Sequence, residues 1–314
     1  MGAQTIMVAG ASGTIGRAVA RAVLADGHRV VCLMRESTAG REAAREVEGL
    51  GGAVCLADVS DPASLKAAFA DHPSDTVISC IASRSGSPKD ARAVDYQANA
   101  NLLAAAEAAG SCHFILLSAI CVQRPMLAFQ HAKLAFEAEL RASTIEHTIV
   151  RPTAFFKSLS GQVERVRKGK PFLIFGDGEL TRCKPISDRD LARFIADCVT
   201  DAERRGKVLP IGGPGPAISL KEQGELLFDA AGKEPRFKSV SPGLFTAAAK
   251  VLSFGAPLSD WLAEKAEYAR IAHYYATESM LVLDPETGEY SADATPEFGN
   301  DTLRDHYAAL LEKH

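Results

Sequence analysis

The first part of the chain alternates short apolar runs with segments in which apolar residues recur at helical spacing. Apolar runs of four to eight residues bounded by Gly, Pro or Asp are typical of buried strands. Strands that alternate with helices through short connections predict a doubly wound α/β fold with a parallel sheet, whose ligand binds at the carboxyl ends of the strands. The predicted strands are Ile6–Ala9, His28–Arg35, Ala53–Val59, Thr76–Arg84 and His113–Ser118, with helices after the first, third, fourth and fifth of them.

After residue 186 the chain is predicted to add one more helix and one more strand to this sheet, and then to form a separate helical part. Ser187–Val199 has the pattern of a capped amphipathic helix, and Val208–Gly212 that of a short strand. From Ser219 onward the helical stretches Leu220–Ala231, Gly243–Leu252 and Leu258–Ala276 predominate. We therefore expect a dinucleotide-binding domain of Rossmann type, together with a smaller, mainly helical C-terminal substrate lobe. The predicted boundaries are residues 1–154 and 186–213 for the first, and 155–185 and 214–314 for the second.

Three glycines separate the first strand from the first helix. Their spacing is GxxGxxG, and they lie where the chain must turn from strand to helix. Glycines let a backbone turn tightly and approach a ligand closely, and the free N–H groups of a helix N-terminus favour a pyrophosphate. The turn predicts nucleotide binding, although glycine turns also occur without a ligand. The residues expected at the phosphates are Gly10, Ser12, Gly13, Thr14, Ile15 and Gly16.

The end of the second strand indicates which dinucleotide is bound. An acid at this position would accept hydrogen bonds from the ribose 2′-hydroxyl of NAD, whereas an Arg accommodates the 2′-phosphate of NADP. Here the residue is Arg35, and Ser37 offers a second donor. We expect NADPH, with a solvated strand-end charge as the alternative interpretation of Arg35. Further cofactor contacts are predicted where the third and fourth strands end, at Asp58, Val59, Ile81, Ala82 and Ser83.

Composition and charge exclude several classes of protein. The 314 residues carry a net charge of −4, with no basic excess of the kind that nucleic-acid binding requires. No apolar run reaches membrane-spanning length, and no signal or transit peptide is recognised, although peripheral contact with a membrane stays open. The seven cysteines form no CxxC pair. We expect no metal site, and a bacterial protein of the reducing cytoplasm.

Phe129 and Lys133 share one face of an amphipathic helix after the fifth strand. Together with the glycine turn and Arg35, this FxxxK resembles the YxxxK of the short-chain dehydrogenase superfamily, in its atypical, NmrA-like branch. The resemblance implies that Lys133 is catalytic and holds the nicotinamide ribose. The proton-donating Tyr of that superfamily is Phe129 here, and its helix Asn is Asp95. Because a phenyl ring has no proton to give, the usual carbonyl chemistry is not expected.

A narrower resemblance covers most of the chain. Six segments are similar to the NADPH-dependent 3,8-divinyl chlorophyllide a 8-vinyl reductases: Leu117–Gln123, Arg151–Leu159, Phe175–Gly178, Cys183–Ser187, Leu209–Gly215 and Tyr274–Tyr290. Phe at the YxxxK position also belongs to that family's pattern. The resemblance implies reduction of the C8 vinyl group of 3,8-divinyl chlorophyllide a, or of divinyl protochlorophyllide a, to ethyl, in chlorophyll or bacteriochlorophyll synthesis.

The same resemblance completes the predicted site. A magnesium tetrapyrrole is flat and largely apolar, so aromatic faces are expected to stack on it; the alternative is that these aromatic residues belong to the core. The added cofactor contacts are Ser118, Lys133, Pro152 and Thr153, and the substrate contacts are Phe129, Phe155, Phe156, Tyr274 and Tyr275.

Two other functions are compatible with FxxxK. An NmrA-like protein without the catalytic Tyr can be a redox sensor that binds NADP(H) without turnover. A related photosynthetic assembly factor can use the fold as a binding surface. Neither function gives a reason for the segments at 151–159 and 274–290, and we therefore favour the reductase.

Overall fold

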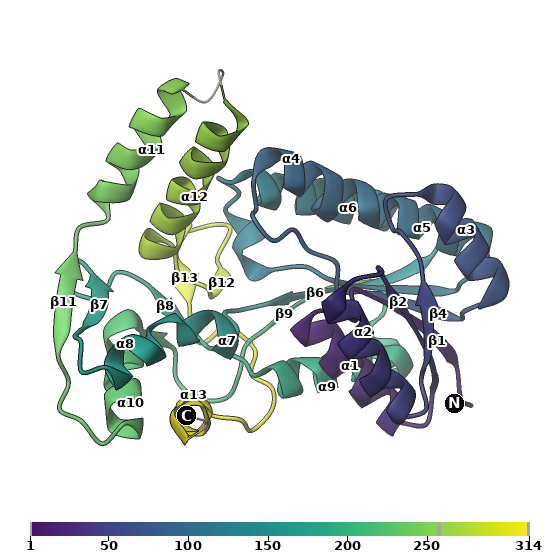
Figure 1. The fold of residues 1–314 in the computed structure, drawn as a ribbon, viewed down its shortest axis with the longest axis horizontal. Helices are drawn as coiled ribbons and strands as arrows, with labels where there is room; N and C mark the ends of the chain where they lie inside the picture. The colour runs from purple at the N-terminus through teal and green to yellow at the C-terminus, as the bar shows by residue number, and fades with distance from the viewer. Residues whose placement is uncertain (1, 256–258, 313–314) are drawn as a thin grey trace.

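The structure, a computed structural model, describes residues 2–255 and 259–312. Its centre is a seven-stranded parallel sheet with the strand order β3-β2-β1-β4-β5-β6-β9 (Figure 1). The order reverses beside β1, which is where open α/β sheets bind their ligands. The strands are β1 (Thr5–Ala9), β2 (Arg29–Met34), β3 (Ala53–Leu56), β4 (Thr76–Ser79), β5 (His113–Leu117), β6 (Glu146–Pro152) and β9 (Lys207–Ile211).

Helices cover both faces of this sheet, and the first strand shows why. Successive side chains of a strand point to opposite faces. Ile6 and Val8 lie in one buried cluster with α1, α2 and α9, whereas Met7 and Ala9 lie in another with α3, α5 and α6. The predicted doubly wound fold is therefore confirmed. The helices are α1 (Thr14–Ala25), α2 (Thr38–Gly49), α3 (Pro62–Asp71), α5 (Asn99–Ala108), α6 (Ala128–Ala142) and α9 (Asp188–Thr200).

The helical segment before β5 begins earlier than the sequence predicted. We expected a helix from about Tyr96, but the chain already turns helically at α4 (Pro88–Asp90) and continues through a π-helical segment, Ala91–Ala98, into α5. π-Helical turns are uncommon and often mark functional positions. This one contains Asp95, which is buried.

The remaining elements form a second, smaller body beside the carboxyl ends of the sheet (Figure 1). It contains the predicted helices and, in addition, three two-stranded sheets that the sequence did not reveal. Leu258, the predicted start of the longest helix, lies outside the described residues. No described helix is both long and apolar enough to span a bilayer. The division into residue ranges stays a prediction. The elements are α7 (Phe156–Leu159), α8 (Val163–Arg167), β7 (Phe172–Phe175), β8 (Arg182–Cys183), β10 (Ile218–Ser219), α10 (Leu220–Ala230), β11 (Phe237–Val240), α11 (Gly243–Gly255), α12 (Asp260–Thr277), β12 (Val282–Leu283), β13 (Tyr290–Ser291) and α13 (Leu303–Glu312).

Candidate functional site

The glycine turn has the geometry of a phosphate cradle. Gly10 adopts φ +84°, and a Cβ there would lie 2.7 Å from the carbonyl oxygen of Cys80 at the end of β4. A Cβ on Gly16 would meet the Gly10 carbonyl even more closely. The turn thus brings bare backbone to the helix start, and among the described residues no side chain caps α1 at Gly13. The first N–H groups of α1 are free to bind an anion.

Not all six residues predicted for this turn face the same space. Gly10, Ser12 and Gly13 line a cleft of about 290 Å³. Ile15 packs into the core instead, and the hydroxyl of Thr14 accepts a hydrogen bond of 2.6 Å from the Lys157 amine. The ammonium of Lys157, from α7, therefore lies beside the helix start, where it adds positive charge close to the expected pyrophosphate.

The same cleft contains the predicted specificity residue. Arg35, Asp58 and Val59 line it from the ends of β2 and β3, and Ile81 and Ala82 from the end of β4. The pKa of Asp58 is lowered, first by the hydroxyl and backbone N–H of Ser60 and then by the Arg35 charge. The exposed guanidinium thus lies in the cleft, at the position expected for a 2′-phosphate. Ser37 is the N-cap of α2, where its oxygen accepts from Gly40 N.

Lys133 forms a buried ion pair. Its amine lies 2.9 Å from Oδ1 of Asp95, and the two side chains are only 11% and 1% exposed. Asp95 Oδ1 also accepts from the backbone N–H of Ser83, which follows β4, whereas Oδ2 is buried without a partner among the described residues. The pair links α6 to the end of β4. In the sequence Asp95 stands out only as the residue that replaces the superfamily's Asn, and its charge within a helical segment is the signal for a buried partner.

Ser118 is placed differently from what the resemblance implied. Its hydroxyl donates a 2.5 Å hydrogen bond to Glu137, which is ion-paired with Arg151 beneath the end of the sheet. The Ser118 hydroxyl is therefore engaged with Glu137. Contact between Ser118 and the cofactor stays a prediction, and it would have to involve the Ser118 backbone.

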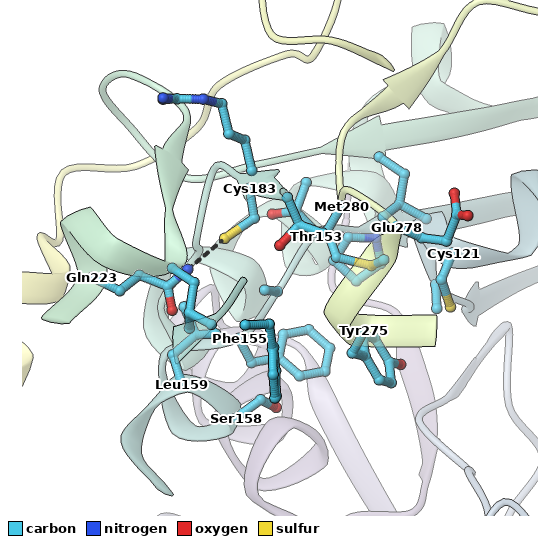
Figure 2. Close-up of a pocket in the computed structure, with 18 residues that line it drawn as sticks. Cys121, Thr153, Phe155, Ser158, Leu159, Cys183, Gln223, Tyr275, Glu278 and Met280 are labelled. Carbon is cyan, nitrogen blue, oxygen red and sulfur yellow. Dashed lines mark hydrogen bonds between the residues drawn. The ribbon is translucent and has the colours of Figure 1, made fainter. Parts of the chain in front are cut away.

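A second cavity, of about 450 Å³, opens beyond the carboxyl ends of β5 and β6 (Figure 2). Pro152, Thr153 and Ala154 line it from the sheet, and Phe155 and Leu159 from the segment that follows. Most of the lining is apolar, and its volume lies within the range of small-molecule sites. The cavity and the cofactor cleft lie at the same edge of the parallel sheet. Residues that sequence analysis did not name here include Ser158, Thr181, Gln223, Glu278 and Met280.

The five predicted aromatic contacts take three different places in the structure. Phe155 and Tyr275 line the cavity (Figure 2). Phe156 is 2% exposed and packs against His306, and Tyr274 is 2% exposed with its hydroxyl donating to the Cys121 carbonyl. Those two residues are core, which was the alternative considered. Phe129 is partly buried close to Gly86, beside the cluster that contains Tyr274.

The polar groups around the cavity are mostly engaged. The carboxylate of Glu278 accepts hydrogen bonds from Arg124 at 3.0 Å and from the Tyr290 hydroxyl at 2.8 Å. Burial raises the pKa of the Cys183 thiol to about 12 and also raises that of Cys121. Both thiols are therefore protonated at neutral pH and are not nucleophiles.

Comparison with known proteins identifies the family. Residues 10–202 match a family model described as NAD(P)H-binding. A Cucumis sativus protein, divinyl chlorophyllide a 8-vinyl-reductase, chloroplastic, is 50% identical over 319 residues, covering 98% of this chain and 76% of that protein. This chain belongs to the divinyl chlorophyllide a 8-vinyl-reductase family. Membership confirms the predicted family, the oxidoreductase class and the nicotinamide cofactor.

More distant likenesses agree with this family's fold. The Escherichia coli NADPH-dependent quinone oxidoreductase QOR2 superposes with a TM-score of 0.71 at 20% identity, over 97% of this chain and 99% of that one. The photosystem II assembly factor Ycf39 of Synechocystis is 27% identical over 66% of this chain and 62% of its own length. The assembly-factor alternative thus has a much weaker match than the 8-vinyl-reductase family.

The predicted bacterial, cytoplasmic location is wrong. The plant relatives that are 47–50% identical over 98% of the chain are named as chloroplastic proteins. All seven cysteines lie in the described residues and are free. Free thiols indicate a reducing environment, but more than one compartment provides one, and for this reason the inference failed.

Proposed function

We propose that this chain catalyses the NADPH-dependent reduction of the 8-vinyl group of 3,8-divinyl chlorophyllide a, or of divinyl protochlorophyllide a, to an ethyl group. The observation that carries the proposal is the apolar cavity at the carboxyl ends of β5 and β6, at the same edge of the sheet as the glycine turn. Phe155 and Tyr275 offer aromatic faces to a flat macrocycle there.

The residues of the cleft fit a bound NADPH. Gly10 provides the close backbone approach, the start of α1 and Lys157 favour the pyrophosphate, and Arg35 favours the 2′-phosphate. When bound, the cofactor supplies a hydride to the vinyl group, and a proton completes the ethyl group. The protein's part is to hold the two reactants in register and to exclude water.

Lys133 is the residue we assign to the proton. The Lys133 amine lies against Asp95 and can deliver a proton directly or through water, whereas the Phe129 ring has no proton to give. The same position on α6 suits a contact with the nicotinamide ribose. The vinyl group is conjugated with the macrocycle, so the negative charge left by hydride addition spreads into the ring. The site therefore needs no strong acid.

The test is conversion of the substrate itself. The purified chain is incubated with NADPH and 3,8-divinyl chlorophyllide a, and the pigment is followed by a blue shift of its Soret band and by chromatographic separation of the monovinyl product. Conversion that depends on NADPH is expected, both in the wild type and in Phe129→Tyr. Tight binding of NADPH without any conversion would overturn the proposal and favour a sensor or assembly factor.

A matched pair of variants on α12 locates the substrate. Tyr275 lines the cavity, whereas Tyr268, two turns earlier on the same helix, is 69% exposed and does not. Losing one stacked ring should raise the KM for chlorophyllide about three- to tenfold in Tyr275→Ala. Tyr268→Ala should leave the KM unchanged when the pigment is presented in detergent. Equal effects would place the pigment elsewhere.

A further inference from the structure

Helix α11 exposes a continuous apolar stripe. Leu244, Ala247, Ala248, Val251 and Phe254 recur at helical spacing and are all exposed, and the most exposed are Val251 at 75% and Phe254 at 93%. The opposite side of α11 packs against α12, with which it forms an antiparallel hairpin that projects from the rest of the molecule (Figure 1). Such a run of exposed apolar side chains marks an interaction surface.

The far end of the hairpin has the composition of a lipid-facing segment. Residues 251–259 contain no charged side chain, and Lys250 is the one charged residue of α11. Trp261, at the start of α12, is 61% exposed, and the Lys265 amine lies 5.9 Å from its ring centre. Trp and Tyr concentrate at the interface between lipid and water, and Lys chains there extend toward the headgroups.

The base of the hairpin is continuous with the substrate cavity. The Phe245 ring, in the first turn of α11, packs edge-on against Phe175, which lines the cavity. At the same base of the hairpin, in the last turn of α12, Tyr275 also lines the cavity. The hairpin therefore connects the exposed stripe of α11 to the site proposed for an apolar pigment.

We propose that the exposed apolar side chains Val251, Phe254 and Trp261 of the α11–α12 hairpin insert into the surface layer of a lipid bilayer. With 13 residues, α11 is shorter than the roughly 20 that a spanning helix needs, so it would lie within the interface. A protein partner would need a polar rim around the apolar stripe, whereas α11 has one charged residue and residues 251–259 have none; the other charged residues of the hairpin belong to α12. The proposal goes beyond the proposed function, and vesicle binding can be measured without pigment or cofactor.

The chain contains a natural reporter for this insertion. Trp261 is the only tryptophan in the sequence and lies in the first turn of α12. Full-length protein is mixed with vesicles of phosphatidylcholine, and with vesicles that also contain phosphatidylglycerol. Insertion should shift the Trp261 emission to the blue, and lipids brominated on their acyl chains should quench it. Because apolar insertion provides most of the binding, high salt should weaken it less than about threefold.

Two variants decide the matter. Phe254→Ser with Val251→Ser removes two lipid-facing side chains and should weaken vesicle binding at least about thirtyfold. Leu50→Ser, which changes a residue 51% exposed at the end of α2, is the matched control and should bind like the wild type. Since all three side chains are exposed, the thermal unfolding curves should stay unchanged.

Several results would overturn the proposal. One is the absence of any emission change with either kind of vesicle, and another is equal binding by the double variant. A third is a concentration-dependent dimer, seen by light scattering without vesicle binding, that the double variant disperses; the stripe would then be an interface between copies. None of these results bears on whether the detergent-presented pigment is reduced, so failure here is distinct from failure of the proposed function.

Discussion

Replacing Lys133 with Met should destabilise the cofactor-free protein by about 3–5 kcal/mol, because it removes one partner of a buried ion pair. The Lys133 amine and Asp95 Oδ1 are 2.9 Å apart, and the Asp95 side chain is 1% exposed. After the substitution, the carboxylate would keep one bond to the Ser83 N–H, at 3.3 Å, and Oδ2 already has no partner among the described residues. The remaining charge would be buried and nearly uncompensated.

Urea unfolding of matched variants measures this effect. Lys184→Met is the control: its amine is also buried, at 7% exposure, but its partner Glu297 is 46% exposed and can be solvated by water, so the loss should be about 1 kcal/mol. Adding Asp95→Asn to Lys133→Met neutralises the stranded charge and should restore about 2 kcal/mol. If Lys133→Met costs no more than Lys184→Met, or if Asp95→Asn restores nothing, the two residues do not act as a pair. Because Lys133→Met is expected to be less stable, its turnover at saturating NADPH is measured at a temperature where the variant is folded. We expect that turnover to be lost.

Three further predictions concern the cofactor cleft and the sheet. Arg35→Ala should raise the KM for NADPH about tenfold or more and leave the KM for NADH nearly unchanged, since only NADPH has the 2′-phosphate. If both KM values changed equally, Arg35 would not bind the 2′-phosphate. Gly10→Ala should abolish NADPH binding measured by fluorescence titration, because the new Cβ would lie 2.7 Å from the Cys80 carbonyl oxygen. The control is Gly27→Ala. Gly27 also has a positive φ, of +80°, but its Cβ would meet no described atom within 4 Å, so NADPH binding should persist. Burial, and then the Arg205 charge, lowers the pKa of His113 from 6.5 to about 4. Because the folded protein favours neutral His113, the free energy of unfolding keeps this contribution above about pH 6.5 and should fall by about 3 kcal/mol as the pH drops toward 4. Urea unfolding of His113→Gln at the same pH values should not show this decrease.

The sequence predicted the sheet well, because each part of that prediction rested on a local pattern. The glycine turn and the strand that ends beside Arg35 are read directly from consecutive residues, and the structure places both in one cleft. The three two-stranded sheets were not predicted, since strands such as Arg182–Cys183 and Ile218–Ser219 have only two residues each and show no period. The Asp95–Lys133 pair was also missed, because it joins residues on different helices.

Adjacent aromatic residues show most clearly what a one-dimensional pattern leaves undecided. Phe155 faces the cavity and Phe156 the core; Tyr275 faces the cavity and Tyr274 the core. Neighbours in a helix, or at the start of one, point about 100° apart, so at most one of each pair can enter a given space. The sequence supplies both candidates, and only the packing of the second body on the sheet decides between them.

Helix α12 contacts both α6, which carries Phe129 and Lys133, and the apolar cavity. The Glu267 carboxylate of α12, 4% exposed, accepts the Ala128 N–H at 2.9 Å and thus caps α6 one residue before Phe129. Two turns later, α12 presents Tyr275 to the cavity. The helix that carries Lys133 is therefore anchored by a helix that lines the cavity proposed for the pigment. Phe129 and Ile271 of α12 both lie close to Gly86 and pack against the same apolar cluster, so the Phe129 ring adds to an apolar wall. Lys133, one turn further along α6, is the residue proposed to deliver the proton, and the turnover of Lys133→Met tests that proposal.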